Sequence, residues 1–87
     1  MQATKIQQEM EITLRVRFDD IDMTILDVFR KYPSRRYKVH QILPILSYQG
    51  IRINYGELSR RLGFLSSLTL IDKKKTSNVF SYQLSKN

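Results

Sequence analysis

The stretch NYGELSRRLGFLSS, residues 54–67, predicts an α-helix that is buried along one side and open along the other. Asn54 and Glu57 have the spacing of a capping box, in which each side chain accepts the backbone N–H of the other residue. Leucines at positions 58, 62 and 65 form an apolar stripe. At about 100° per residue, the opposite face carries small, polar or basic residues: Gly56, Ser59, Arg60, Gly63 and Ser67.

The sequence after this helix predicts a β-hairpin with a basic tip. We expect residues 68–71 (LTLI) to form the first strand and residues 79–84 (VFSYQL) to form the returning strand. The connection between them, residues 72–78, contains Lys73, Lys74 and Lys75, and we expect these lysines to lie at the tip.

A first helix is expected upstream, beginning in the acidic run Asp19-Asp20-Ile21-Asp22 and ending near Tyr32, because Pro33 forbids its continuation. Its side chains predict one buried stripe. Met23 and Leu26 point elsewhere, which indicates that the first strand or another subunit covers the helix on a second side. The stripe consists of Ile21, Ile25, Val28 and Tyr32, with Phe29 beside it.

A second helix is expected after Ser34–Lys38 and should end near Gly50. Pro44 lies within its apolar pattern, so that the helix is either kinked or shorter than the pattern suggests. Its apolar positions are Val39, Ile42, Leu43 and Leu46.

The N-terminal part predicts one β-strand. Residues 1–8 are polar and we expect them to be disordered, whereas residues 9–18 alternate between apolar and polar side chains without a break. A strand with an apolar face and no local partner needs another edge to pair with. We therefore expect Met10–Phe18 to pair with its counterpart in a homodimer or, less favoured, to dock on the hairpin.

The composition indicates a single soluble domain, because two cores in 87 residues would each be too small to be stable. The chain has no cysteine and no apolar run of the roughly 20 residues that span a bilayer, so we expect a cytoplasmic protein, nucleoid-associated if the source is prokaryotic. Residues 1–27 carry a net charge of −3 and residues 28–87 one of +10. Such a field attracts polyanions, and nucleic acid is the first partner to consider.

Catalytic and metal-binding patterns do not emerge from the sequence. His40 is the single histidine and has no cysteine to share a metal with. The acidic residues Asp19, Asp20 and Asp22 are explained by the positive end of a helix dipole, and the three glycines form no phosphate-binding loop. We expect a protein that is not an enzyme and that needs no cofactor or metal.

The order of the elements resembles that of the winged helix-turn-helix superfamily of DNA-binding domains. The residues that carry the resemblance are Leu58–Ile71, similar to a recognition helix and the entry to a wing, then Lys73–Lys75 and Tyr82–Leu84. The resemblance covers residues 20–84 and implies an α+β fold with three helices and a C-terminal hairpin wing, to which the N-terminal strand is an addition. It implies a non-enzymatic protein that binds double-stranded DNA, most often a transcriptional regulator.

The same resemblance implies which residues contact DNA. The helix from Tyr55 to Ser67 would enter the major groove, with Arg60 as the candidate for bidentate contact with guanine. The predicted contacts of the helix and its flank are Tyr55, Ser59, Arg60 and Arg61; those of the wing are Lys73, Lys74 and Lys75; further phosphate contacts are Arg35, Arg36, Lys38 and Arg52.

Three other interpretations remain open. Residues 12–20, followed by a helix and Ser34-Arg35-Arg36, resemble ribbon-helix-helix repressors, in which Thr13, Arg15 and Arg17 would read the major groove. That interpretation leaves residues 50–87 unexplained. The basic surface also fits an architectural binder without sequence preference, or an adaptor that meets an acidic protein.

Overall fold

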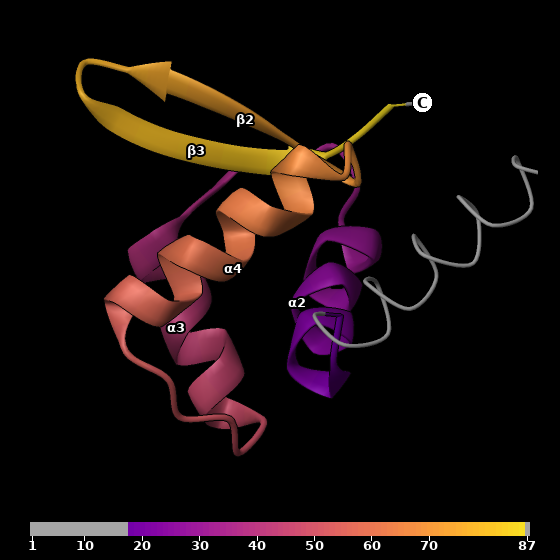
Figure 1. The fold of residues 1–87 in the computed structure, drawn as a ribbon, viewed down its shortest axis with the longest axis vertical. Coiled ribbons are helices and arrows are strands. Elements are labelled where there is room, and N and C mark those ends of the chain that lie inside the picture. The colour runs from indigo at the N-terminus through magenta and orange to yellow at the C-terminus, as the bar shows by residue number, and fades with distance from the viewer. Residues whose placement is uncertain (1–17, 87) are drawn as a thin grey trace, which may run out of the picture.

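The computed structural model describes residues 18–86, which form three helices and a three-stranded antiparallel sheet (Figure 1). The predicted α+β class is confirmed. The predicted strand Met10–Phe18 lies outside the described residues, apart from Phe18 itself, and so do residues 1–8. The elements, in chain order, are α2 (Asp20–Lys31), β1 (Tyr37–Lys38), α3 (Val39–Tyr48), α4 (Tyr55–Ser67), β2 (Ile71–Thr76) and β3 (Val79–Leu84).

The sheet has the strand order β1-β3-β2, and β2 and β3 form a long hairpin that lies along α4 (Figure 1). The register pairs Ile71 with Leu84 at the base of the hairpin and Thr76 with Val79 at its tip. Because side chains alternate between the faces of a strand, the hairpin has two distinct faces. We call them the inner face (Ile71, Lys73, Lys75, Phe80, Tyr82, Leu84), which packs on the helices at its base, and the outer face (Asp72, Lys74, Thr76, Val79, Ser81, Gln83).

The core lies between the three helices and the inner face of the sheet. The predicted leucine stripe is confirmed, since Leu58, Leu62 and Leu65 are each 0% exposed. Tyr82 from β3 and Tyr37 from β1 close the core on the sheet side, and Tyr37 makes an edge-to-face contact with Phe29 at 5.4 Å between ring centroids. The leucine stripe therefore fixes which side of α4 faces away from the core.

Helix α2 begins as predicted and is buried over a wider arc than the predicted stripe. Asp19 caps the helix, and its carboxylate accepts the backbone N–H of Asp22 while Asp22 accepts that of Asp19. Leu26 lies off the predicted stripe and is 2% exposed, because α2 contacts both α3 and β3, whereas Met23 is 43% exposed. Tyr32 is 51% exposed because it follows the last helical turn with a non-helical backbone, so its expected place on the stripe is wrong.

Helix α3 continues through Pro44 and ends at Tyr48, with Val39, Ile42 and Leu46 buried. Gly50 has a positive φ of 84°, and the N–H of Ile51 reaches back to the carbonyl of Leu46 at 2.9 Å. This is a Schellman ending, which favours glycine at the left-handed position. The two-residue strand β1 immediately before α3 was not predicted.

The hairpin is correctly placed in the sequence, but its turn is not where the lysines are. The first strand runs from Ile71 to Thr76, rather than from Leu68 to Ile71, and the turn consists of Ser77 and Asn78. Both turn residues have positive φ, 50° and 65°, as a type I′ turn requires. The prediction that Lys73, Lys74 and Lys75 form the tip is therefore wrong: they lie along β2, two on the inner face and one on the outer.

Candidate nucleic-acid interface

The outward face of α4 is set by its cap and its leucines. The side chain of Asn54 accepts the N–H of Glu57 at 2.7 Å, which starts the helix as predicted. The second hydrogen bond expected of a capping box, from the backbone N–H of Asn54 to the Glu57 carboxylate, is not among the contacts of the described residues. The Glu57 carboxylate binds Arg61 instead. With Leu58, Leu62 and Leu65 facing the core, the opposite side of the helix carries the exposed residues Gly56, Arg60 and Ser67 and the partly exposed residues Ser59 and Gly63.

Arg60 lies on this open side and is exposed. Within residues 18–86 it has no hydrogen-bond or ion-pair partner, so its guanidinium is available to a ligand as far as those residues are concerned. Gly56 and Gly63 have no side chains to cover the helix backbone beside Arg60, and a Cβ on Gly63 would meet nothing within 4 Å. A partner can therefore approach the backbone of α4 closely here.

The flank of α4 that faces the hairpin carries hydroxyl groups. Burial raises the pKa of Tyr82 above its usual value, the neighbouring Tyr55 adds to the rise, and interaction with the Ser59 hydroxyl acts in the opposite direction. Tyr82 is 1% exposed, whereas Tyr55 is 58% exposed at the first turn of α4. Ser59 and Tyr55 thus lie where α4 meets the inner face of the hairpin.

The inner face of the hairpin carries two of the three lysines. Lys73 Nζ lies 4.2 Å from the centroid of the Phe80 ring and Lys75 Nζ lies 5.7 Å from it. Lys74 lies on the outer face, where it is the cross-strand neighbour of Ser81. Sequence reasoning missed Phe80, although its position opposite Lys75 follows once the turn is placed at Ser77-Asn78.

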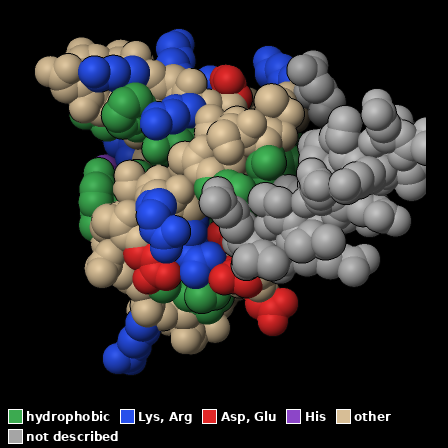
Figure 2. All heavy atoms as spheres, in the orientation of Figure 1, with side chains coloured by type: hydrophobic (Ala, Val, Ile, Leu, Met, Phe, Trp, Pro, Cys, Tyr) green, Lys and Arg blue, Asp and Glu red, His purple; other side chains and the backbone are tan. Residues whose placement is uncertain are grey.

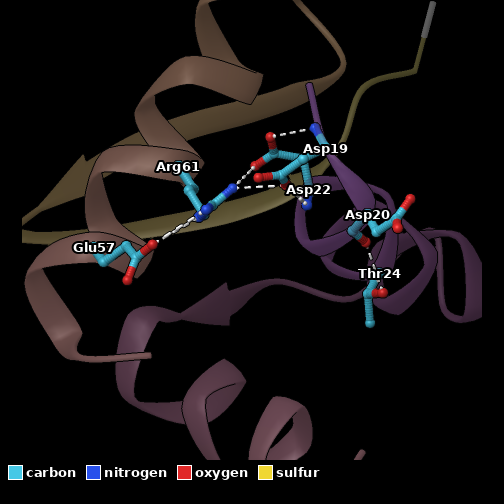
Figure 3. A network of polar contacts seen from close by, with 6 residues as sticks. All are labelled: Asp19, Asp20, Asp22, Thr24, Glu57 and Arg61. Carbon is cyan, nitrogen blue, oxygen red and sulfur yellow. Dashed lines mark hydrogen bonds and ion pairs between the residues drawn. The ribbon is translucent and has the colours of Figure 1, made fainter. Parts of the chain in front are cut away.

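Arg61 is not part of this open surface, contrary to the expectation that it would meet phosphate. Its side chain is 13% exposed and its guanidinium pairs with Asp19 at 2.8 Å, Asp22 at 3.1 Å and Glu57 at 3.1 Å (Figure 3). Burial opposes the charge of Arg61, but the three carboxylates outweigh this and raise its pKa. Arg61 thus joins α4 to the start of α2, and Nε, Nη1 and Nη2 of its guanidinium each donate to these carboxylates rather than to DNA.

The remaining predicted contacts are spread around the molecule. Arg36 pairs with Asp72 at 3.1 Å and lies within 3.4 Å of the Ser81 hydroxyl, on the outer face. Lys38 is also a cross-strand neighbour of Ser81. Arg35 stacks on the Tyr37 ring at 5.2 Å, and Arg52 is exposed between α3 and α4. Of the predicted residues, Tyr55, Ser59 and Arg60 lie on α4, and Lys73 and Lys75 lie on the inner face of the hairpin, whose first strand contacts that helix.

Charge is unevenly distributed over the side of the molecule that α4 occupies. Figure 2 shows basic side chains over the hairpin and along α4, with most acidic side chains gathered lower on this face. Three of the acidic side chains are already paired. Asp19 and Asp22 bind backbone N–H groups at the start of α2 and the guanidinium of Arg61, and Glu57 also binds Arg61. Within residues 18–86, no three metal-ligating side chains are grouped to hold an ion.

Comparison with protein-family models, with curated proteins and with solved structures finds no match to this chain. In the part of the chain that the structure describes, no helix has the length and apolar character needed to cross a membrane.

Proposed function

We propose that the chain is a winged-helix protein that binds double-stranded DNA, with α4 in the major groove and the hairpin as a wing, and that it regulates transcription without being an enzyme. The order of three helices around a short strand, followed directly by the hairpin, supports the winged-helix assignment. So does the sheet order β1-β3-β2, in which the short strand pairs with the returning strand of the hairpin.

The observation that carries the proposal is the open face of α4. Arg60 stands exposed on it between two glycines, and the single acidic side chain of the helix, Glu57, is neutralised by Arg61. A helix with a low, cationic surface fits the width of a major groove. Basic residues that serve only solubility can be scattered over the whole surface. Here a cationic helix surface and a cationic hairpin belong to elements that contact each other, which favours DNA binding.

The proposed contacts follow from this geometry. Arg60 donates to guanine as a bidentate pair, and Ser59 and the glycines allow the backbone to approach the base edges. Tyr55, at the first turn, donates its hydroxyl to a phosphate, and Lys73 and Lys75 bind the backbone beside it. Arg35, Arg36, Lys38 and Arg52 remain peripheral phosphate contacts. Lys74 is left out because it lies on the outer face of the hairpin, and Arg61 because its donors are occupied.

The test is a selection of bound fragments from random duplex DNA at two salt concentrations, followed by affinity measurements for Arg60→Ala. Loss of about 1–3 kcal/mol on the selected sequence, with little change on random DNA, supports sequence-specific reading. The matched control is Arg30→Ala, an exposed arginine on α2 that pairs with Asp27, and it should leave the affinity unchanged.

Two outcomes favour other functions. Uniform weakening of all sequences by Arg60→Ala, with no selected site, indicates an architectural binder. Absence of any affinity for duplex DNA at low salt contradicts the proposal and indicates an adaptor whose basic surface meets an acidic protein.

A further inference from the structure

The hairpin presents apolar surface near its tip on both faces. Phe80 on the inner face is 39% exposed and Val79 on the outer face is 44% exposed. Phe80 differs from Val79 in its surroundings, because Lys73 and Lys75 both lie over its ring. An exposed aromatic ring next to two cations is matched by a ligand that offers anionic groups close to an apolar surface.

The two faces also differ in charge. The outer face carries one cation and one carboxylate, Lys74 and Asp72, and Arg36 pairs with Asp72 there at 3.1 Å. The inner face carries no acidic side chain between Ile71 and Leu84, so no carboxylate of that face competes with a ligand for Lys73 and Lys75. The hairpin is thus a stronger anion-binding element on one side than on the other.

The inner face is continuous with the open surface of α4. Tyr82, two residues after Phe80 on the same face, lies against Ser59 of α4, and β2 contacts α4 directly. A duplex seated on Arg60 therefore passes the inner face of the hairpin first. Tyr82 itself is buried, and the exposed residues next to it on the inner face are Lys73, its cross-strand neighbour, and Phe80.

We propose that the hairpin contacts duplex DNA with its inner face alone, and that Phe80 makes the apolar contact. Lys73 and Lys75 move from the ring to phosphates, and the uncovered ring packs on deoxyribose or an opened base step in the groove. This inference rests on the proposed function. It adds that hairpin binding has a salt-independent part, carried by one side chain.

The structure supplies matched variants on opposite faces for the test. Phe80→Ala and Val79→Ala remove apolar groups of similar exposure from adjacent positions, and Lys75→Gln and Lys74→Gln remove one charge each from the inner and outer face. Equilibrium binding of the full chain to a fluorescent duplex is measured over a series of salt concentrations. The probe is the selected duplex or, if none is selected, a random-sequence one.

We expect Phe80→Ala to weaken binding roughly tenfold at every salt concentration with an unchanged slope, because the lost contact releases no counterion. Lys75→Gln should lower the slope of log affinity against log salt by about 0.9. Val79→Ala and Lys74→Gln should each stay within about twofold of the parent. Phe80→Leu keeps apolar area and should retain most of the affinity.

Failure of the inference and failure of the proposed function give different results. If the parent does not bind duplex DNA, the proposed function fails and the inference with it. If the parent binds and Phe80→Ala matches Val79→Ala, the inference is overturned while DNA binding stands. Should Phe80→Ala not fold, photo-crosslinking through p-benzoylphenylalanine at position 80 or 79 decides: crosslinks to DNA from position 80 alone support the inference, and equal or reversed yields overturn it.

Discussion

The guanidinium of Arg61 lies 3.1 Å from the carboxylate of Asp22, a side chain that is 1% exposed at the start of α2. The contact joins residues 39 positions apart in the sequence. Asp22 has a second task, since its other oxygen accepts the backbone N–H of Asp19. One buried carboxylate therefore holds both the start of α2 and its contact with α4 (Figure 3).

Removal of the Arg61 charge should destabilise the protein strongly. Arg61→Met keeps much of the aliphatic packing but leaves Asp22 as a buried charge without its cation, which typically costs about 3–5 kcal/mol. Urea denaturation at neutral pH measures the effect. The neighbouring Arg60→Ala is the control, and its free energy of unfolding should change by no more than about 0.5 kcal/mol. Equal effects of the two substitutions would contradict the structural role assigned to Arg61.

Acid should weaken the fold through Asp19. Burial opposes its charge, but the N–H of Asp22 and the guanidinium of Arg61 outweigh this and lower the pKa of Asp19 below its usual value. The unfolded chain therefore takes up the proton first, so this stabilisation is complete above the ordinary pKa of about 3.9 and is lost as pH falls through the lower folded value.

Asp19→Asn isolates this contribution. Asparagine still caps the helix but has no charge for Arg61. The variant should be less stable than the parent at pH 7, and the difference in urea midpoint should shrink as the pH drops below about 4. A difference that stays constant down to strongly acidic pH would show that the charge of Asp19 contributes nothing.

The parts of the fold that were predicted correctly are those with local signals. Helix α4 is specified by Asn54 before it and by the leucines within it, and both signals lie inside 14 consecutive residues. The exposure of Arg60 follows from the same pattern, because a residue about 160–180° away from a buried stripe has nothing to pack against. The core of the candidate site was therefore accessible from sequence.

The parts that were missed depend on contacts between distant segments. Strand β1 has two residues, too few for any periodicity, and exists because Tyr37 and Lys38 pair with β3. The hairpin turn was misplaced because a lysine run is polar enough to suggest a loop, whereas in an edge strand such lysines are common and prevent edge-to-edge pairing. Glu57 and Arg61 have helical i,i+4 spacing, which is a local signal. The pairing of Arg61 with Asp19 and Asp22 has no such signal in the sequence, because these residues are far apart along the chain.

Thr69 should be replaceable by glycine with a gain in stability. It has a positive φ of 59° after α4, with its N–H bonded to the Ser66 carbonyl at 2.9 Å and that of Leu70 bonded to the Leu65 carbonyl at 3.1 Å. This is the same Schellman geometry that follows α3, where the equivalent residue is Gly50. A β-branched residue is strained in this region, so Thr69→Gly should raise the free energy of unfolding by about 1 kcal/mol.

Gly50→Ala is the reciprocal test of the same geometry. A Cβ at Gly50 would meet no atom within 4 Å, so that any loss of stability comes from the backbone conformation alone. We expect a loss of about 1 kcal/mol by urea denaturation. Opposite signs for the two variants support the assignment of both helix ends; a loss in both would point to a role for the Thr69 hydroxyl, which contacts the Leu68 carbonyl.

Alkaline pH should loosen the contact between the hairpin and α4 through Tyr82. Because burial raises the pKa of Tyr82, the folded chain keeps the phenolic proton at a pH where the unfolded chain has lost it. The stabilisation is therefore complete below the ordinary tyrosine pKa of about 10 and is lost as pH rises through the higher folded value.

Tyr82→Phe cannot ionise, so its urea midpoint should fall less steeply than that of the parent above about pH 10. Tyr48→Phe, at a side chain that is 95% exposed, is the control and should follow the parent. A Tyr82→Phe curve that coincides with the parent curve up to the highest pH would mean that the Tyr82 hydroxyl is no more protected in the fold than a phenol in water.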